Sequence, residues 1–312
     1  MTIYQTRVTL GADLGNDNAQ LVTSMVELMI KNKVDKGISM DIEMAKNNNT
    51  YNVVFNGEKF LVGDRAETFS SETEGKNTQN HLMCFLVLLS KTVPTNSIVD
   101  VVLSESINKY FDENHKQNII KRFQGEHKIE VNEETFFYKI DKVHILPEGM
   151  GHKLLNPSKY LNRTTYTVDL GSSTSIFMQN EGLIPLQSRS KSSNYGMHTL
   201  VANIKAELSK QDIANNLTSQ QIKEYIEYGS SNCDVARVVQ EEKIKLLEKF
   251  NKEMESIINL KNHIETIEFV GGTSIILKKE IEEMYKTAVV MEDALWATAR
   301  GNYAFAVQKF SR

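Results

Sequence analysis

The sequence lacks an excess of charge of either sign. It holds 36 Lys and Arg residues against 40 Asp and Glu residues, which leaves a net charge of −4. Binding to nucleic acid or to an anionic membrane relies on a large positive surface charge, and this balance gives no global reason to expect either. We therefore expect no direct nucleic-acid partner and no membrane partner.

Cysteine and long hydrophobic runs are also scarce. The two cysteines, Cys84 and Cys233, lie far apart without the spacing of a metal or redox motif, and Cys84 sits in an apolar run that suggests a small buried hydrophobe. The longest apolar run, residues 82–89, is much shorter than the roughly 20 residues that cross a bilayer. The N-terminus shows no signal-peptide pattern. These absences predict a cytoplasmic protein.

What the chain does have is enough apolar sequence for a large core. Hydrophobic residues make up 40% of the 312 residues and charged residues 24%, values that are ordinary for a globular protein. This length suits two halves of about 150 residues each. Strand-like and helix-like segments alternate in both halves, which predicts an α/β fold with helices covering mixed sheets.

Several segments predict individual elements. Asn56-Gly57 between two alternating apolar segments predicts a β-hairpin. Residues 79–93 predict a buried helix, and residues 107–124 have helical spacing throughout. Residues 234–258 predict a long helix whose apolar stripe favours packing on a sheet over a coiled-coil seam. Asp293 is a plausible N-cap of the terminal helix.

The clearest internal pattern is a repeated tripeptide. Asp-Leu-Gly occurs at residues 13–15 and again at residues 169–171, each time between two apolar, strand-like runs. Both places therefore predict a strand, a tight turn and a second strand. The recurrence indicates two similar domains, and the cleft between two such domains is a natural ligand site.

Each of these turns can bind phosphate, because small residues let backbone N–H donors approach phosphate oxygens closely. The two predicted phosphate turns are Gly15, Asn16, Asp17 and Asn18 in the first half and Gly171, Ser172, Ser173 and Thr174 in the second. The carboxylates of Asp13 and Asp169 would hold Mg²⁺ against the phosphates, usually through water. One copy alone is better explained as a plain turn, but two copies in matched contexts favour a phosphate site.

A third motif, FVGGTSIIL, places Gly271 and Gly272 between an apolar strand and the start of a helix. Backbone at such a helix start can approach a ligand, and the helix N-terminus favours an anion. An ordinary turn explains Gly-Gly equally well. The motif therefore gains weight only together with the two phosphate turns.

In order and spacing, the two phosphate turns and FVGGTS resemble the actin-like ATPase superfamily, which includes actin, the heat-shock chaperone ATPases, sugar kinases and bacterial actin homologues. The resemblance covers essentially the whole chain, and IVDVVLSESI and LWATARGNY resemble the superfamily's two connecting segments. The short length, FLVGDRA, ILPEG and ARGNY look most like the plasmid-segregation actins of the ParM and Alp type. Those proteins bind ATP or GTP, form homopolymer filaments and move plasmids through an adaptor DNA-binding protein at a centromere-like site.

The resemblance implies an α/β protein with two RNase H-like, actin-like domains and a nucleotide cleft between them. Domain I would span residues 1–160, with a small inserted subdomain at about residues 33–91 and the C-terminal helix, residues 293–312, packing back onto it. Domain II would span residues 161–292.

The resemblance also implies roles for single residues, in a reaction that depends on orientation and charge stabilisation. Asp13 would position Mg²⁺, Asp169 would orient the metal and the attacking water, and Glu148 would polarise that water. The residues implied in nucleotide binding are Gly15, Asn16, Asp17, Asn18, Gly171, Ser172, Ser173, Gly271, Gly272 and Thr273. For Glu148, a carboxylate that caps a helix start is an equally good interpretation.

The chain departs from the family pattern in two places. Many relatives have a lysine where this chain has Gln20, and its loss would weaken phosphate attraction unless another residue substitutes for it. The first connecting segment usually contains Gly-Leu-Pro, whereas here it reads Ser104-Glu105-Ser106, which would alter the hinge between the domains.

The leading functional hypothesis is a nucleotide-dependent, filament-forming ATPase that segregates plasmid DNA. The alternative is a small-molecule (sugar or acid) kinase of the same superfamily, which needs a general base aimed at a substrate hydroxyl. Glu105 is the only candidate base in the first connecting segment. A nucleotide-sensing module of the chaperone type would need an appended substrate domain, of which the sequence gives no sign.

Overall fold

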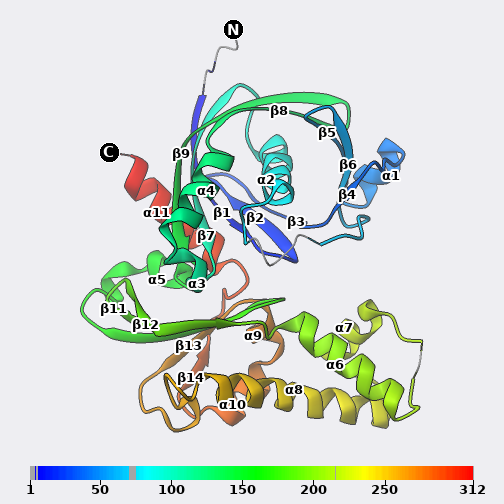
Figure 1. Cartoon of the computed structure of the whole chain (residues 1–312), viewed down its shortest axis with the longest axis vertical. Helices are drawn as coiled ribbons and strands as arrows, with labels where there is room; N and C mark the ends of the chain where they lie inside the picture. The colour runs from blue at the N-terminus through cyan, green and yellow to red at the C-terminus, as the bar shows by residue number, and fades with distance from the viewer. Residues whose placement is uncertain (1–3, 5, 70–74, 215, 312) are drawn as a thin grey trace. The chain divides into compact units, whose positions relative to one another are not determined.

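A computed structural model describes residues 4, 6–69, 75–214 and 216–311 of the chain. The chain forms two compact units (Figure 1). The first unit comprises residues 1–159 and 296–312, and the second comprises residues 160–295. None of the helices in the described ranges has the length and hydropathy needed to cross a bilayer.

The first unit is built on a nine-stranded sheet of order β3-β2-β1-β7-β9-β8-β5-β6-β4. Its strands are β1 (Thr6–Leu14), β2 (Asn18–Val22), β3 (Glu27–Lys31), β4 (Val34–Lys36), β5 (Thr50–Phe55), β6 (Glu58–Gly63), β7 (Ser97–Glu105), β8 (Gly125–Val131) and β9 (Glu134–Pro147). The strands β1, β7 and β9 run parallel at its centre. The predicted hairpin at Asn56-Gly57 is confirmed, since both residues have positive φ (53° and 81°) between paired β5 and β6.

One helix of the first unit is buried on all sides. The helices of this unit are α1 (Ile42–Asn47), α2 (Gln79–Thr92), α3 (Ile107–Tyr110), α4 (Glu113–Phe123), α5 (Gly151–Leu155) and α11 (Ala297–Phe310). Every residue of α2 from His81 to Leu89 is buried, Cys84 included. The helix contacts β1, β2, β3 and β8, and Figure 1 shows curved strands around it. The predicted buried helix is therefore confirmed and forms the centre of this core.

The second unit has a five-stranded sheet of order β12-β11-β10-β13-β14. Its strands are β10 (Thr164–Leu170), β11 (Ser175–Glu181), β12 (Ile184–Ser193), β13 (Ile267–Val270) and β14 (Ala288–Val290). Its helices are α6 (Met197–Lys210), α7 (Ser219–Tyr228), α8 (Cys233–Met254), α9 (Gly272–Ile276) and α10 (Lys278–Met284). The strands β10, β13 and β14 run parallel, and β11 and β12 continue from β10 as antiparallel neighbours.

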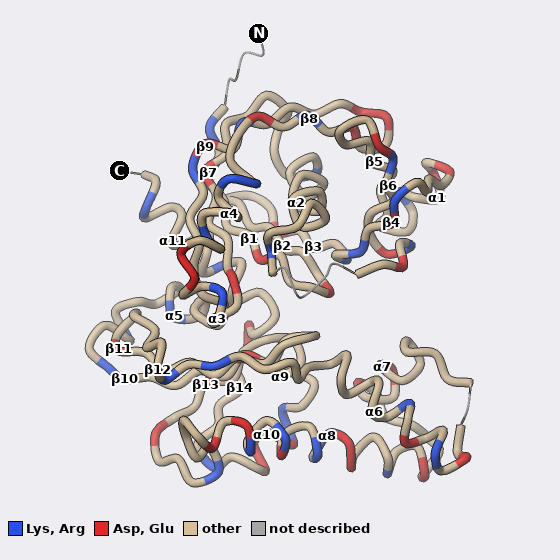
Figure 2. The backbone as a smooth tube through the Cα atoms, in the orientation of Figure 1, with Lys and Arg blue, Asp and Glu red and all other residues tan. Residues whose placement is uncertain are grey.

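The long helix α8 covers the core of the second unit. Leu247, Phe250 and Met254 of its predicted stripe are buried there. Lys245 and Lys249 lie on its exposed side, where Figure 2 shows charges of both signs along the helix. The stripe therefore packs inside the unit, as predicted.

The two units share one strand order. The shared order is β3-β2-β1-β7-β9 in the first sheet and β12-β11-β10-β13-β14 in the second. In each, three consecutive strands form an antiparallel meander, and two further strands run parallel to β1 or to β10, the first strand of the meander along the chain. The additional strands β8, β5, β6 and β4 extend only the first sheet. The predicted α/β architecture with two similarly built halves is confirmed.

Of two further local predictions, one is confirmed in two pieces and the other is wrong. The helical segment at residues 107–124 is divided into α3 and α4, because the side chain of Asp112 accepts a hydrogen bond from the backbone N–H of His115 and caps a new helix. Asp293 does not cap the terminal helix, which begins at Ala297 after Trp296. The segment before this helix forms turns instead, and its Ala294 carbonyl accepts from the backbone N–H of Gly271 at 3.2 Å.

Candidate functional site

The carboxyl ends of β1, β7 and β9 gather acidic side chains in the first unit. Parallel neighbouring strands end at one edge of a sheet, and these three end next to Asp13, Glu105 and Glu148. The backbone N–H of Glu148 donates to the carbonyl of Glu105 at 2.9 Å, which joins two of the strand ends directly. The register of the sheet thus brings together acids that lie far apart in the sequence.

A buried lysine enters this group of acids. Lys76 Nζ lies 2.7 Å from Asp13 Oδ1 and 2.7 Å from Glu148 Oε1, and only 6% of its side chain is exposed. Ser104 lies beside it, with its Oγ 3.4 Å from Lys76 Nζ and donating to Asp13 Oδ1 at 3.1 Å. We refer to Lys76, Asp13, Ser104, Glu105 and Glu148 as the Lys76 cluster. The sequence patterns predict nothing about Lys76.

Mutual attraction sets the charge states of this cluster. Burial by itself lowers the pKa of Lys76, but Asp13, Glu148 and Glu105 outweigh burial and raise that pKa, so the ammonium stays charged. Burial raises the pKa of Glu148, and Lys76 opposes this rise. Burial also acts to raise the pKa of Glu105, but the hydrogen bond from His115 and the charge of Lys76 lower it to about 2.

Glu105 holds the Lys76 segment in place. Its Oε2 accepts from the backbone N–H of Lys76 at 2.9 Å and lies 2.9 Å from His115 Nε2. Its Oε1 accepts from the backbone N–H of Ser106 at 2.7 Å. Because both carboxylate oxygens already accept hydrogen bonds, Glu105 positions other groups and is poorly placed to act as a base on a substrate hydroxyl.

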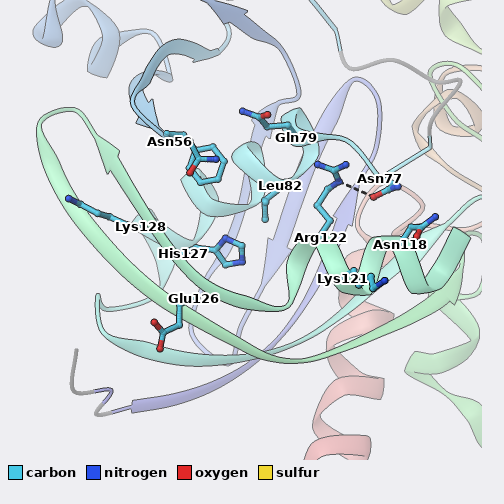
Figure 3. A pocket seen from close by; sticks show the side chains of 11 residues that line it. Asn56, Asn77, Gln79, Leu82, Asn118, Lys121, Arg122, Glu126, His127 and Lys128 are labelled. Carbon is cyan, nitrogen blue, oxygen red and sulfur yellow. Dashed lines mark hydrogen bonds between the residues drawn. The ribbon is translucent and has the colours of Figure 1, made fainter. Parts of the chain in front are cut away.

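A second anchor of the same segment lies beside a basic hollow. Asn77 Oδ1 accepts from Arg122 Nε at 2.9 Å, and the side chain of Thr78 caps α2 (Figure 3). The hollow has a volume of about 690 Å³ and contains no member of the Lys76 cluster. It is lined by Phe55, Asn56, Asn77, Gln79, Leu82, Asn118, Lys121, Arg122, Glu126, His127 and Lys128. The segment that carries Lys76 is therefore held at Lys76 itself and at the two residues that follow it.

The C-terminal helix α11 supports β1 just before Asp13. Asn302 Nδ2 donates to the carbonyl of Ala12 at 2.8 Å. At Gly11 there is no room for a side chain, because a Cβ there would strike the backbone of α11 at Tyr303. Close packing of helix on strand thus fixes the backbone that positions Asp13.

The first phosphate turn connects β1 and β2. Its predicted residues are Gly15, Asn16, Asp17 and Asn18, all half-buried. Asn32 fastens the turn by donating from Nδ2 to the carbonyl of Gly15 at 2.8 Å and from its backbone N–H to the carbonyl of Asp17 at 3.0 Å. Asp17 Oδ2 pairs with Lys31 Nζ at 3.1 Å. In the described part of the chain, the buried Oδ1 of Asn18 has no hydrogen-bond partner.

The second phosphate turn connects β10 and β11 and carries no charged residue. Its residues are Gly171, Ser172, Ser173 and Thr174. The backbone N–H of Gly171 donates to the carbonyl of Thr174 at 2.9 Å, which closes the turn. His198 donates from its backbone N–H to the carbonyl of Ser172 at 2.8 Å, and its Nδ1 lies 3.2 Å from Ser173 Oγ. Gly196 packs so closely that a Cβ there would meet the carbonyl oxygens of Gly171 and Ser172.

The Gly-Gly motif lies against the second phosphate turn. Thr273 Oγ1 donates to the carbonyl of Gly171 at 2.7 Å. Gly271 has a φ of 88°, and a Cβ there would strike Asp169 Oδ1. Gly272 is the first residue of the short helix α9. The second unit therefore brings together Asp169, the second phosphate turn and residues 271–273.

The residues present fit a magnesium site that is completed by phosphate. Within the described residues, no three His, Cys, Asp or Glu side chains converge to hold a metal ion by themselves. Magnesium is commonly held by one or two carboxylates together with substrate phosphates and water. Within its own unit, each of Asp13 and Asp169 supplies one carboxylate beside a phosphate turn, which fits the protein part of such a donor set.

The capping interpretation of Glu148 is wrong. The nearby helix α5 has Met150 at its N-cap and no side-chain hydrogen bond to its first turn. The Glu148 carboxylate bonds Lys76 instead. This leaves the carboxylate inside the cluster at the strand ends.

Comparison with known proteins gives two matching family models. Residues 11–151 match the N-terminal domain of actin-like proteins, and residues 167–283 match the MreB-like C-terminal domain of the archaeal actin homologue. No curated protein matches the chain by sequence.

Solved structures resemble the chain over nearly its whole length. The ADP complex of Ta0583, an archaeal actin homolog, has a TM-score of 0.75 and 17% sequence identity, covering 97% of this chain and 99% of that one. The apo psk41 ParM protein has a TM-score of 0.72 and 16% identity, covering 98% and 99%. A 15-stranded ParM filament from Clostridium botulinum has a TM-score of 0.74 and 15% identity, covering 97% and 100%.

Identities this low establish similarity of fold alone. The two family models add sequence evidence, and between them they span both units of the chain. The chain therefore belongs to the actin-like proteins, with an actin-like N-terminal domain and an MreB-like C-terminal domain.

Proposed function

We propose that the chain is a nucleotide-dependent, filament-forming ATPase that segregates plasmid DNA in the cytoplasm through an adaptor protein bound at a centromere-like site. One observation carries the proposal. The same tripeptide, Asp-Leu-Gly, ends the first strand of the same five-strand arrangement in both units. A duplicated turn of this kind supports the binding of one triphosphate by both phosphate turns.

Several features support the parts of this proposal. The Ta0583 relative is described as a complex with ADP, and the Clostridium botulinum relative as a filament, which supports nucleotide binding and self-association here. ATP is the proposed nucleotide, with GTP as the competing one. The plasmid and adaptor roles rest on the resemblance to segregation actins.

In the proposed mechanism, backbone N–H groups of both phosphate turns bind phosphate oxygens, and the hydroxyls of Ser172 and Ser173 add donors. Asp13 and Asp169 would hold Mg²⁺, which supplies charge neutralisation on the phosphates when bound. Glu148 accepts a hydrogen bond from the attacking water and orients it toward the terminal phosphate. Residues 271–273 lie against the sugar and base.

The kinase alternative is weaker. Its only candidate base in the first connecting segment, Glu105, is 1% exposed and accepts hydrogen bonds at both oxygens. A buried acid in this state, with its pKa held at about 2, is a poor acceptor for a substrate proton.

The experiment is sedimentation and negative-stain imaging of the purified protein with Mg-ATP, Mg-GTP, Mg-ADP and no nucleotide, together with phosphate release. We expect filaments that require a triphosphate, and phosphate release that follows polymer formation. Asp169→Ala should abolish release. A protein that stays unpolymerised with every nucleotide, and instead phosphorylates an added sugar or acid, would overturn the proposal in favour of the kinase.

A further inference from the structure

No positive charge stands opposite Asp13 on the neighbouring strand β2. Gln20 stands opposite Asp13 in the pairing of β1 with β2, so the two side chains leave the same face of the sheet. Gln20 is buried, and its Nε2 contacts Met29 Sδ at 3.6 Å. A neutral amide at this position supplies no cation to a triphosphate, and the lysine that does lie at the turn, Lys31, pairs with Asp17 Oδ2 at 3.1 Å.

We propose that Lys76 supplies the phosphate-binding cation of the first unit, in place of a lysine at position 20. This inference rests on the nucleotide site proposed above. Lys76 reaches Asp13 from a different direction, out of the segment that precedes α2. Its ammonium nevertheless lies beside the carboxylate that closes β1, next to the first phosphate turn.

The exposure of the cluster indicates where a ligand would meet Lys76. The side chains of Asp13 and Glu148 are 23% and 17% exposed, whereas that of Glu105 is 2% exposed. Lys76 Nζ therefore contacts the two acids of the cluster whose side chains still reach solvent. A phosphate bound on the turn beside Asp13 could take over one of the hydrogen bonds that Lys76 now donates, and the long unbranched lysine stem permits that short movement.

The charge count favours the same conclusion. Lys76 is the only lysine or arginine paired with Asp13 or Glu148 in the described residues, and Glu105 adds a third carboxylate. Lys76 bonds both Asp13 and Glu148, whereas Glu105 also lies 2.9 Å from His115 Nε2. Without Lys76, an incoming triphosphate would meet the negative charges of Asp13 and Glu148 in a partly buried place, where charges interact strongly.

A purely structural salt bridge is the competing explanation. It predicts that loss of Lys76 lowers stability and leaves nucleotide affinity unchanged in the folded protein. The substitution Gln20→Lys separates the two explanations, because the pairing register places a new lysine on the face of Asp13 without restoring the Lys76 segment.

The experiment measures the affinity of the full chain for a fluorescent ATP analogue with Mg²⁺, for the parent, K76M, Q20K/K76M and the control K121M. Lys121 is exposed and lines the basic hollow. We expect K76M to bind the ATP analogue roughly 10- to 100-fold more weakly than the parent, as for loss of one charge-assisted hydrogen bond. The difference between K76M and the parent should shrink at high salt, which screens charges. Q20K/K76M should bind the analogue at least tenfold more tightly than K76M. The control K121M should bind it like the parent.

Thermal unfolding without nucleotide checks that each variant is folded. If K76M does not fold, nucleotide affinity is compared between E148Q and E148Q/K76M. In the double variant the acid at position 148 is already neutral, so loss of Lys76 leaves one fewer buried carboxylate without a cation. Unchanged affinity on loss of Lys76, or no recovery with Q20K, would overturn the inference while leaving the proposed function intact. A parent protein that binds neither ATP nor GTP would overturn the proposed function, and this inference with it.

Discussion

The two phosphate turns share a tripeptide and a strand order, yet their surroundings differ in charge. In the first unit, Asp13 belongs to a cluster with one lysine and two further acids. In the second unit, the turn is held by neutral groups, among them the hydroxyl of Thr273 and the backbone of His198. Turns that share a tripeptide thus differ in electrostatics, both through their own residues, such as Asp17, and through segments elsewhere in their unit.

The close-packed glycines show the same division. In the first unit, Gly151 and Gly301 let α5 and α11 touch backbone to backbone, and Gly11 lets α11 pack on β1 two residues before Asp13. In the second unit, Gly196 and Gly271 make their closest approaches to the second turn and to Asp169. Glycine therefore serves helix packing in the first unit and the turn itself in the second.

The largest effect is expected at Gly301. In an isolated helix, Gly301→Ala would stabilise by about 1 kcal/mol. Here the new methyl group strikes the backbone of Gly151, so we expect a loss of roughly 3 kcal/mol in the free energy of unfolding. Urea denaturation measures it, with Gln308→Ala on the exposed side of α11 as the control. A stabilised variant would show that helix propensity outweighs this contact.

Next comes the Lys76 cluster of the first unit. Glu148→Gln keeps the shape of the side chain but removes the carboxylate that we propose polarises water. We expect turnover to fall about 100-fold, while nucleotide affinity changes less than threefold. Phosphate release and nucleotide titration measure the two quantities, with the exposed Glu134→Gln as control. Normal turnover would limit Glu148 to its ion pair with Lys76.

A smaller effect concerns pH and the buried helix of the first unit. Burial, and then the charge of Lys76, lower the pKa of His81 from 6.5 to about 3. The unfolded chain therefore binds the proton first on acidification, and the stability due to neutral His81 is lost as pH falls through this window. Between pH 7 and pH 5 the loss is about 2 kcal/mol.

Denaturation at both pH values tests this expectation. Other histidines with lowered pKa, such as His127 and His144, act in the same direction, so the informative quantity is the difference between parent and His81→Gln. The variant should lose about 2 kcal/mol less than the parent on acidification. Equal losses would mean that His81 is not kept neutral by its surroundings.

The smallest effect is expected in the neutral turn of the second unit. Ser173→Ala removes one hydroxyl that we assign to phosphate binding, while its partner His198 keeps its backbone bond to the turn. Nucleotide affinity should fall about fivefold, or about 1 kcal/mol, as for one neutral hydrogen bond. The exposed Ser209→Ala serves as control. If Ser173→Ala lowered nucleotide affinity as much as K76M does, the neutral second turn would contribute as much to binding as the charged cluster of the first unit, contrary to this comparison.

Local sequence signals predicted much of the fold. The apolar run of α2, the Asn56-Gly57 hairpin and the repeated Asp-Leu-Gly turns all depend on neighbours within a few residues, and all are present. The break between α3 and α4 was missed because Asp112 can sit inside a helix or cap one, and the choice depends on packing of the flanking segments. The start of α11 was misplaced because Gly271 holds the segment before it in turns.

By itself, the sequence determined the two similarly built halves, both phosphate turns and the acids that end their first strands, because these follow from periodicity and turn chemistry. Only the tertiary structure decided that Lys76 is buried among Asp13, Glu105 and Glu148. A lysine in a polar segment ordinarily lies in water. Its burial here follows from the parallel pairing of β1, β7 and β9, which gathers three acids at one edge and offsets the cost of removing an ammonium from solvent.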